Sequence, residues 1–174
     1  MSEQPERNEL PNRVEYRLNG KRHRADGPAI EWVDGSKAWY VDGKYHRLDG
    51  PAIEWGNGHK EWYVDGKRHR TDGPAIEWAN GHKEWYVDGE CHRLDGPAIE
   101  REDGTKTWYV YGKRHWLDGP ARECADGTKL WYIMGRKVSK PDVDNLRLKT
   151  ITLSFALNRR IWKLFGTNYV KKVI

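Results

Sequence analysis

The sequence predicts a mainly β protein, an elongated single-layer antiparallel sheet of repeated β-hairpins that ends in a C-terminal helical cap. The first observation is the segment His-Arg-Ala-Asp-Gly-Pro-Ala-Ile at residues 23–30, which returns nearly unchanged every 23 residues. A fixed period of this length is typical of arrays in which one small unit stacks on its neighbours. The second is an Asn-Gly or Asp-Gly pair inside every copy. The third is a content of ten Trp and nine Tyr in a chain that is only 37% hydrophobic, because large aromatic side chains can bury enough area to order a thin structure.

Residues 1–13 precede the repeats and are polar, with two prolines. We expect this segment to be disordered, and it has no apolar stretch of the kind found in a signal peptide. The repeat array is predicted over residues 14–137 as about five to six units. Residues 138–174 form a basic tail of different composition, in which the repeat decays.

Each unit is predicted to be one hairpin followed by a loop. Two strand-like segments, Pro51–Trp55 and Lys60–Val64 in one copy, flank the pair Asn57-Gly58. Asn-Gly and Asp-Gly tolerate the positive φ angles of a type I′ turn, so the pair predicts a tight connection. A further pair, Asp65-Gly66, ends the second strand. Because a single hairpin is barely stable in water, neighbours are expected to pair into one sheet, in which each unit advances roughly 10 Å.

The Asp-Gly-Pro segment that starts each hairpin is predicted to be a structural corner. Gly allows the bend, and Pro suits the first residue of a strand. We expect the aspartate to cap its own turn through backbone N–H groups, while the histidine and arginine line the loop between units. The corner residues are His23, Asp26, His46, Asp49, His69, Asp72, His92, Asp95, His115 and Asp118.

The recurring His-Arg-x-Asp combination groups a base, a cation and a carboxylate, as an active site does. An active site needs one pocket, whereas these trios are spaced along an open ribbon. Histidines about 10 Å apart are also too distant to share a zinc ion. The additional His59 and His82 lie in hairpin turns, where we expect them to be solvated. We therefore predict no catalytic residue, no metal site and no cofactor.

Two aromatic columns run along the predicted array. One contains Trp39, Trp62, Trp85 and Trp108; the other contains Trp32, Trp55 and Trp78 and then changes to Arg101 and Cys124. These rings either stack as the core of the ribbon or form an exposed aromatic surface, because a single-layer sheet cannot hide both faces. Trp116 replaces the corner arginine in the fifth copy, which indicates a position that tolerates change. The candidate partner-binding residues in the array are Trp39, Trp62, Trp85, Trp108, Arg101 and Trp116.

The repeat resembles the MORN-type repeat in Gly-Lys-Arg-His at residues 66–69, preceded by Trp-Tyr-Val-Asp at 62–65 and followed by the turn Asn80-Gly81. The resemblance covers residues 14–135. It departs after the histidine, where Arg-Thr-Asp-Gly-Pro stands at 70–74 and a MORN unit has an early glycine; this version resembles units in uncharacterised phage and large-virus proteins. It implies a non-catalytic scaffold that binds proteins and, as is sometimes proposed, lipids. It also implies a phage or viral protein that inhibits or sequesters a host defence factor in the host cytoplasm.

The tail carries the basic character of the chain. Residues 1–135 contain 21 Lys/Arg and 24 Asp/Glu, a formal charge of −3, whereas residues 136–174 contain ten Lys/Arg and two Asp, a charge of +8. Leu146–Leu157 alternates like a strand, and Ser154–Phe165 favours a helix that ends at Gly166. If residues 144–165 form one helix, Lys149, Arg159, Arg160 and Lys163 lie along one stripe.

Two roles are open for this tail. It caps the last hairpin and closes the sheet edge, as arrays require, or it is offered to a protein groove, an anionic membrane surface or nucleic acid through Arg159, Arg160 and Lys163. The array has no excess of positive charge, which disfavours nucleic acid.

The leading functional hypothesis is a scaffold that binds a protein partner through the surface of its ribbon. Open ribbon ends also make self-association plausible. Two unpaired cysteines and the lack of a roughly 20-residue apolar run predict a soluble cytoplasmic protein.

Overall fold

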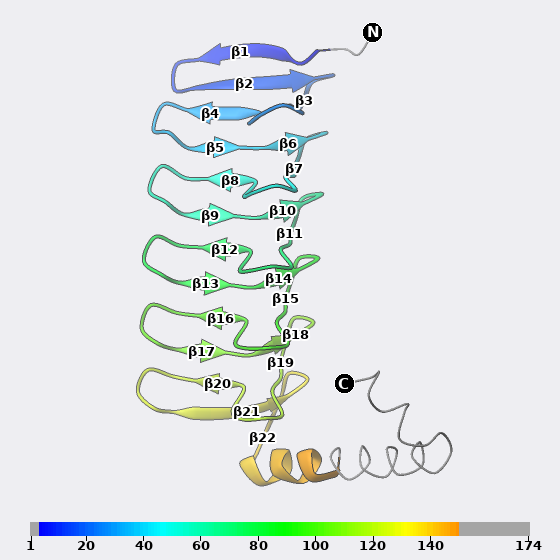
Figure 1. Cartoon of the computed structure of the whole chain (residues 1–174), viewed down its shortest axis with the longest axis vertical. Coiled ribbons are helices and arrows are strands. Elements are labelled where there is room, and N and C mark those ends of the chain that lie inside the picture. Colours follow the sequence, from blue (N-terminus) through cyan, green and yellow to red (C-terminus); the bar gives the residue numbers. More distant parts are fainter. Residues whose placement is uncertain (1–3, 150–174) are drawn as a thin grey trace, which may run out of the picture.

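The computed structural model describes residues 4–149 as a long ladder of short antiparallel strands with a helix across its C-terminal end (Figure 1). The main sheet has 14 strands in the order β1-β2-β4-β5-β8-β9-β12-β13-β16-β17-β20-β21-β22, with β3 paired to β2. Its strands are β1 (Glu6–Leu10), β2 (Arg13–Leu18), β3 (Lys21–Arg22), β4 (Ile30–Trp32), β5 (Lys37–Ala38), β8 (Ile53–Glu54), β9 (Lys60–Glu61), β12 (Ile76–Glu77), β13 (Lys83–Glu84), β16 (Ile99–Glu100), β17 (Lys106–Thr107), β20 (Arg122–Glu123), β21 (Lys129–Ile133) and β22 (Arg136–Val138). The predicted fold class, a mainly β sheet of repeated hairpins with a C-terminal helix, is confirmed.

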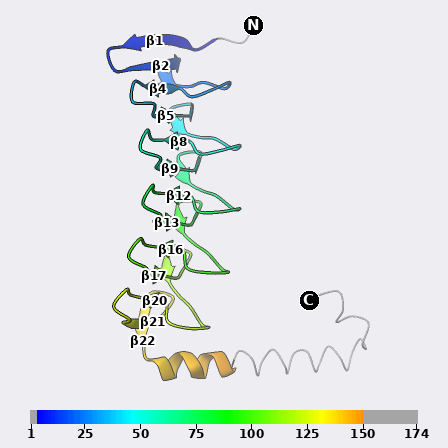
Figure 2. The same cartoon turned by 60° about the vertical axis from the view of Figure 1, so that its left-hand side comes forward.

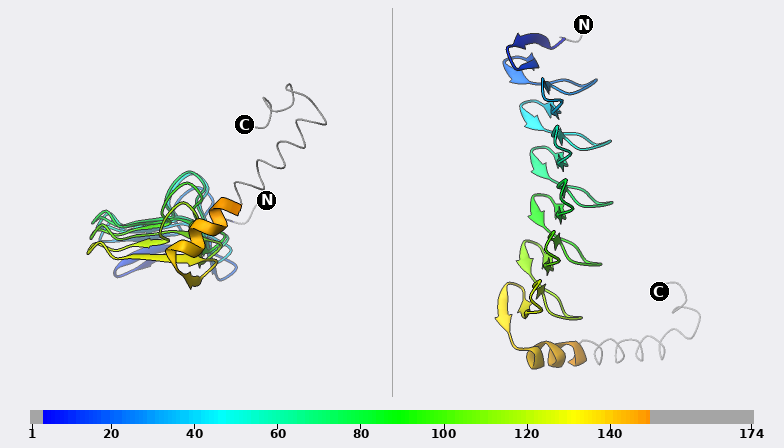
Figure 3. Two further views of the ribbon diagram at one scale, coloured as in Figure 1. Left: turned by 90° about the horizontal axis from the view of Figure 1, so that it is seen from below. Right: turned by 90° about the vertical axis from the view of Figure 1, so that its left-hand side faces the viewer.

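Neighbouring units share one continuous strand ladder, as the marginal stability of a lone hairpin requires. Strand β9 pairs with β8 of its own unit through Ile53↔Glu61, and with β12 of the next unit through Ile76↔Glu61. Seen along the long axis, the units overlie one another (Figure 3). The alanine of each Asp-Gly-Pro-Ala corner is completely buried: Ala29, Ala52, Ala75, Ala98 and Ala121 are each 0% exposed. Its carbonyl accepts a backbone hydrogen bond from the aromatic residue 13 positions earlier, which is Tyr16 for Ala29 and a Trp for the others, as from Trp62 N to Ala75 O at 2.8 Å.

Each central unit contains a second, smaller hairpin that the sequence analysis did not separate from the first. These hairpins line one side of the ladder as two-stranded sheets (Figure 1). They are β6 (Tyr40–Val41) with β7 (Lys44–Tyr45), β10 (Tyr63–Val64) with β11 (Lys67–Arg68), β14 (Tyr86–Val87) with β15 (Glu90–Cys91), and β18 (Tyr109–Val110) with β19 (Lys113–Arg114). The chain leaves the main sheet at the intervening Trp and folds back at an Asp-Gly pair in the first three of these hairpins and at Tyr111-Gly112 in the fourth.

The two turn pairs of a unit have different geometries. At Asn57-Gly58 only the glycine has a positive φ, 89°, and Trp55 N bonds to His59 O across a three-residue connection. This is the arrangement of a turn followed by a left-handed glycine, not the predicted type I′ turn. Both residues have positive φ at Asp65-Gly66, 50° and 80°, as a type I′ turn requires. The tight turn therefore belongs to the second hairpin.

The N-terminal segment differs from the expectation of disorder. Strand β1 pairs with β2 over five residue pairs, from Glu6↔Arg17 to Leu10↔Arg13. Its side chains are mostly charged and exposed, a composition that discourages further strands from adding to the edge of a sheet. Residues 6–10 therefore form the first strand of the array, and the array begins before residue 14.

The C-terminal helix starts at residue 140 and is described to residue 149. Ser139 caps its first turn, because Ser139 Oγ donates to the carboxylate of Asp142 at 2.6 Å and lies 3.4 Å from Asp142 N. Residues 146–149 are helical, so their predicted strand alternative is wrong. The remainder of the predicted 144–165 and 154–165 helices lies outside the described residues. Over residues 4–149, no helix is long and apolar enough to cross a bilayer.

This helix lies across the end of the ladder (Figure 2). Val143 is only 2% exposed, and Arg147 Nε lies 3.2 Å from Asp118 Oδ1 in the last corner loop. Val143, Asp144 and Arg147 form one wall of a small cavity whose other wall contains Leu117 and Trp131. The helix stands where a sixth corner loop would otherwise stand.

We expect Val143→Asp to detach the helix from the last unit, because it removes a buried side chain worth about 2 kcal/mol and places a carboxylate among apolar groups. Amide hydrogen exchange at residues 140–149 should accelerate, and the thermal midpoint should fall. Leu148→Asp is the matched control, because Leu148 is 61% exposed on the same helix. Equal protection in the two variants would contradict docking through Val143.

Candidate interaction surface

The arginine of each corner loop is held by several contacts at once. The guanidinium of Arg47 lies 3.9 Å from the centre of the Trp39 ring, and its Nε donates to Asp49 at 3.0 Å. Its Nη1 donates to Pro51 O at 3.2 Å and to Glu54 at 2.9 Å. The hydrogen bond and the charge of Arg47 hold the pKa of Asp49 below its usual value. The sequence predicts that the aspartate caps its own turn through backbone N–H groups; in the structure the arginine side chain is its main partner.

The same contacts recur in four units. The guanidinium groups of Arg24, Arg47, Arg70 and Arg93 lie 4.0, 3.9, 4.0 and 4.1 Å from the ring centres of Tyr16, Trp39, Trp62 and Trp85. Each ring is half-buried and covered on one face by its own arginine. The Trp column is thus neither a sealed core nor a fully open aromatic surface.

The fifth corner keeps the stack with a different side chain. Trp116 lies over Trp108 with ring centres 5.9 Å apart and an interplanar angle of 29°. Asp118 has no arginine in its own loop and is paired with Arg147 of the helix instead. The Trp116 position keeps its stacking role, and the C-terminal helix supplies the missing guanidinium.

The corner histidines contact the tight turn of the following unit. Nδ1 of His46 lies 3.2 Å from the backbone N of Asp65 and 2.9 Å from its carboxylate. His23 with Asp42 and His69 with Asp88 repeat this pair. The last two corners keep the backbone contact without a carboxylate partner: His92 and His115 accept the N–H groups of Tyr111 and Met134, and the centre of the His92 ring also lies 4.6 Å from that of Tyr111.

His59 is buried, contrary to the expectation that it is solvated. It is 9% exposed, and its Nε2 lies 3.0 Å from Glu61. Tyr63 donates to Glu61 at 2.8 Å and Arg68 at 3.1 Å. Burial raises the pKa of Glu61, but these partners outweigh it and leave the pKa below its usual value. His82 forms the same 3.0 Å contact with Glu84, again partly buried.

Cys91 and Cys124 are free thiols. Cys91 stands in β15 where Arg68 stands one unit earlier. Burial, with a smaller contribution from Glu84, raises the pKa of Cys91 to about 12. The thiolate, which is the nucleophilic form, is therefore strongly disfavoured at neutral pH. Over residues 4–149, no cluster of His, Cys, Asp and Glu could hold a metal ion.

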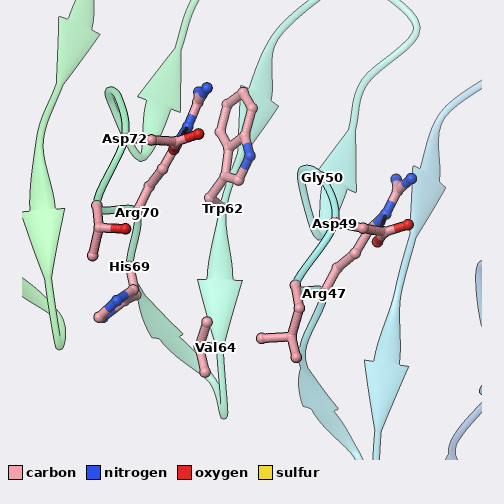
Figure 4. A pocket seen from close by; sticks show the side chains of 10 residues that line it. Arg47, Asp49, Gly50, Trp62, Val64, His69, Arg70 and Asp72 are labelled. Atoms are coloured by element: carbon pink, nitrogen blue, oxygen red, sulfur yellow. Dashed lines mark hydrogen bonds and ion pairs between the residues drawn. The ribbon is translucent and has the colours of Figure 1, made fainter.

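Two equivalent grooves lie between consecutive corner loops. One, of about 670 Å³, has Trp62 and Val64 at its floor and the loops at residues 47–50 and 69–72 as its walls. Figure 4 shows Trp62 between Arg70 of one loop and the residues of the other. The next groove, of about 590 Å³, repeats this around Trp85 and Val87. The exposed Leu48 and Leu94 (80% and 66%) stand on their walls.

The structure thus brings together only part of the predicted site. Trp62 and Trp85 line grooves, and Trp39 and Trp108 occupy the equivalent stacked positions. Arg101 lies apart, in an open depression with His82 and Glu102, and Arg159, Arg160 and Lys163 lie outside the described residues. Leu48 and Leu94 also belong to this surface and are not among the residues predicted from the sequence. Their signal was an apolar residue at the variable position of an otherwise polar loop.

No protein-family model matches this chain, and no curated protein is detectably similar to it.

Proposed function

We propose that this chain is a non-catalytic scaffold that binds a protein partner along the row of grooves between its corner loops. The observation that carries the proposal is the repetition of one groove at successive units, with a Trp floor, arginine walls and exposed leucines. Tryptophan and arginine are the residues enriched where protein interfaces gain most of their energy. Exposed apolar side chains beside such a floor are typical of an interaction surface.

The spacing of the grooves favours an extended partner. Successive units advance by two strand spacings, roughly 10 Å. An extended segment in the polyproline II conformation rises about 3.1 Å per residue with three residues per turn, so every third side chain lies on the same side, about 9 Å apart. One such segment can therefore place a side chain in each groove. A compact small molecule would use only one groove. The repetition therefore favours a polypeptide.

A non-catalytic role fits the contacts of the corner residues. Each histidine is engaged by the turn of the next unit, and each corner arginine is engaged by an aromatic ring, a carbonyl and two carboxylates. The repeated hairpins are compatible with a MORN-like repeat, and MORN-type arrays act as protein-binding scaffolds. Through the resemblance to phage and large-virus units, the partner would be a host factor that the chain sequesters.

The test is affinity capture from the native host, followed by titration calorimetry with the recovered protein. The wild type should recover one stoichiometric partner, and Leu48→Asp combined with Leu94→Asp should weaken binding at least about tenfold by placing charge on both groove walls. Val33→Asp is the matched control, because Val33 is 81% exposed in a hairpin turn and lines neither of these grooves. Unchanged binding of the groove variant, or an equal loss of binding in the Val33→Asp control, would contradict the groove assignment, and turnover of a substrate would contradict the non-catalytic role.

A further inference from the structure

The tips of the second hairpins change character in the last two copies. The first residue of each tight turn has a positive φ, and Asn19, Asp42, Asp65 and Asp88 occupy this position in the earlier copies. Asn and Asp tolerate the left-handed conformation better than other residues with a side chain. Tyr111 and Met134 stand there in the last two copies, with φ of 48° and 47°. Local backbone preference does not explain either residue.

Burial does not explain them either. The side chains of Tyr111 and Met134 are 65% and 46% exposed. Within residues 4–149, the one aromatic ring that Tyr111 contacts is that of His92, with ring centres 4.6 Å apart. The tip that contains Met134 and Gly135 lies against the tip that contains Tyr111. Gly135 is so close to Lys113 that a Cβ added to this glycine would lie 3.8 Å from the Lys113 side chain. Residues that are unfavourable in their turn and exposed to water are characteristic of functional positions. We call Tyr111 and Met134 the tip patch.

The charge along this edge reverses at the same place. The tip before the patch carries two carboxylates, Asp88 and Glu90, both exposed. The following tips carry Lys113 beside Tyr111, and Arg136 and Lys137 beside Met134, all three exposed. Among the tips before the one that carries Asp88 and Glu90, Asp42 with Lys44 and Asp65 with Lys67 balance in charge, and the first tip carries Asn19 with Lys21. The tip patch therefore has the exposed cations Lys113, Arg136 and Lys137 beside it on one side, and on the other side Glu90 of the preceding tip, which lies 3.9 Å from a Cβ built on Gly112. Its apolar side chains distinguish it from every tip before it.

We propose that the tip patch docks an acidic segment of a partner protein, with an apolar side chain inserted between Tyr111 and Met134 and carboxylates facing Lys113 and Arg136. Charge complementarity identifies this occupant. A flat anionic bilayer fits less well, because the tips stand in one row and a plane resting on the patch would also meet Asp88 and Glu90. This edge is distinct from the grooves, so the proposal shares with the proposed function only the premise that the chain binds proteins.

The experiment is selection from a library of random displayed peptides on the full chain, with counter-selection on the variant carrying Tyr111→Asp and Met134→Asp. These substitutions restore the residue type of the earlier copies, so the variant should melt at the same or a higher temperature. The enriched peptides should be acidic with one apolar anchor. They should bind the double variant about 30-fold more weakly, and added salt should weaken their binding to the wild type.

The outcomes separate the two surfaces. Lys113→Glu with Arg136→Glu should also abolish peptide binding, whereas Leu48→Asp with Leu94→Asp and the Val33→Asp control should leave it unchanged. Peptides that need the groove leucines but not the tip patch would overturn this proposal and leave the proposed function intact. Enrichment of neutral or basic peptides, or tighter binding of the chain to phosphatidylserine vesicles than to the selected peptides, would overturn it as well.

Discussion

Glu61→Ala is expected to lower the free energy of unfolding by about 3 kcal/mol, the scale found when one partner of a buried charged pair is removed. Glu61 is 9% exposed and accepts hydrogen bonds from His59, Tyr63 and Arg68. Its loss leaves these donors without their acceptor. His59 is affected most, because its Nδ1 already has no hydrogen-bond partner among the described residues. Guanidinium denaturation followed by Trp fluorescence measures the change.

The chain contains its own control for this variant. One unit earlier the corresponding positions hold Ser36, Ala38 and Tyr45, with Ala38 at 0% exposure and Tyr45 packed on Tyr40 at 4.3 Å. The triple variant His59→Ser, Glu61→Ala, Arg68→Tyr copies that apolar solution into the next unit. We expect it to recover most of the lost stability. A triple variant as unstable as Glu61→Ala would show that the polar cluster is not the cause.

The same cluster predicts a dependence on pH. The folded pKa of Glu61 lies below its ordinary value of 4.5, so its contribution to stability is fully present above that value and is lost as the pH falls through the lower, folded pKa. The stability difference between the wild type and Glu61→Gln should therefore shrink in acid. Denaturation at pH 7 and pH 3 checks this. A constant difference would contradict the role of the carboxylate charge.

Arg70→Ala is expected to cost about 2 kcal/mol, whereas Arg70→Trp is expected to cost much less. The ion pairs of Arg70 with Asp72 and Glu77 contribute little, because those carboxylates are 82% and 34% exposed. Most of the effect comes from uncovering the Trp62 ring, on which the guanidinium stacks at 4.0 Å. A Trp at this position can cover the ring, as Trp116 covers Trp108 in the fifth unit.

Thermal unfolding of the two variants tests this order. Asp72→Asn serves as the control, because it removes the negative charge of one exposed ion-pair partner of Arg70 while the stacking of Arg70 on Trp62 remains. If Arg70→Trp were as destabilising as Arg70→Ala, the charge of the arginine would outweigh its stacking. If the control were as destabilising as Arg70→Ala, the ion pair would be the main contribution.

The sequence predicted the features that depend on local, repeated chemistry. The 23-residue period, the Gly-containing turns and the decay of the repeat after residue 137 were sufficient to predict one antiparallel array with a helix at its end. The assignment of turn types was less successful, because Asn57-Gly58 and Asp65-Gly66 have the same local preference. The geometry of the flanking strands decides between them, and that geometry depends on neighbouring units.

The candidate site was harder to predict because its contacts join residues from different units. His59 lies in a turn, yet the ring of Trp78 from the next unit covers it at 4.9 Å. Asp118 looks like every other corner aspartate, yet its partner comes from residue 147. In each case burial or pairing depends on residues 19 or more positions away, which a local pattern does not contain.

Because each unit makes the same kinds of contacts with the next, the length of this protein can change by whole repeat units. A corner histidine holds the turn of the unit after it, while the corner arginine closes its own loop. A duplication or deletion of one complete period would rejoin the same kinds of contacts and leave both ends closed by β1 and the helix. Expansion or contraction of the gene by whole repeats would therefore lengthen or shorten the molecule by roughly 10 Å at a time.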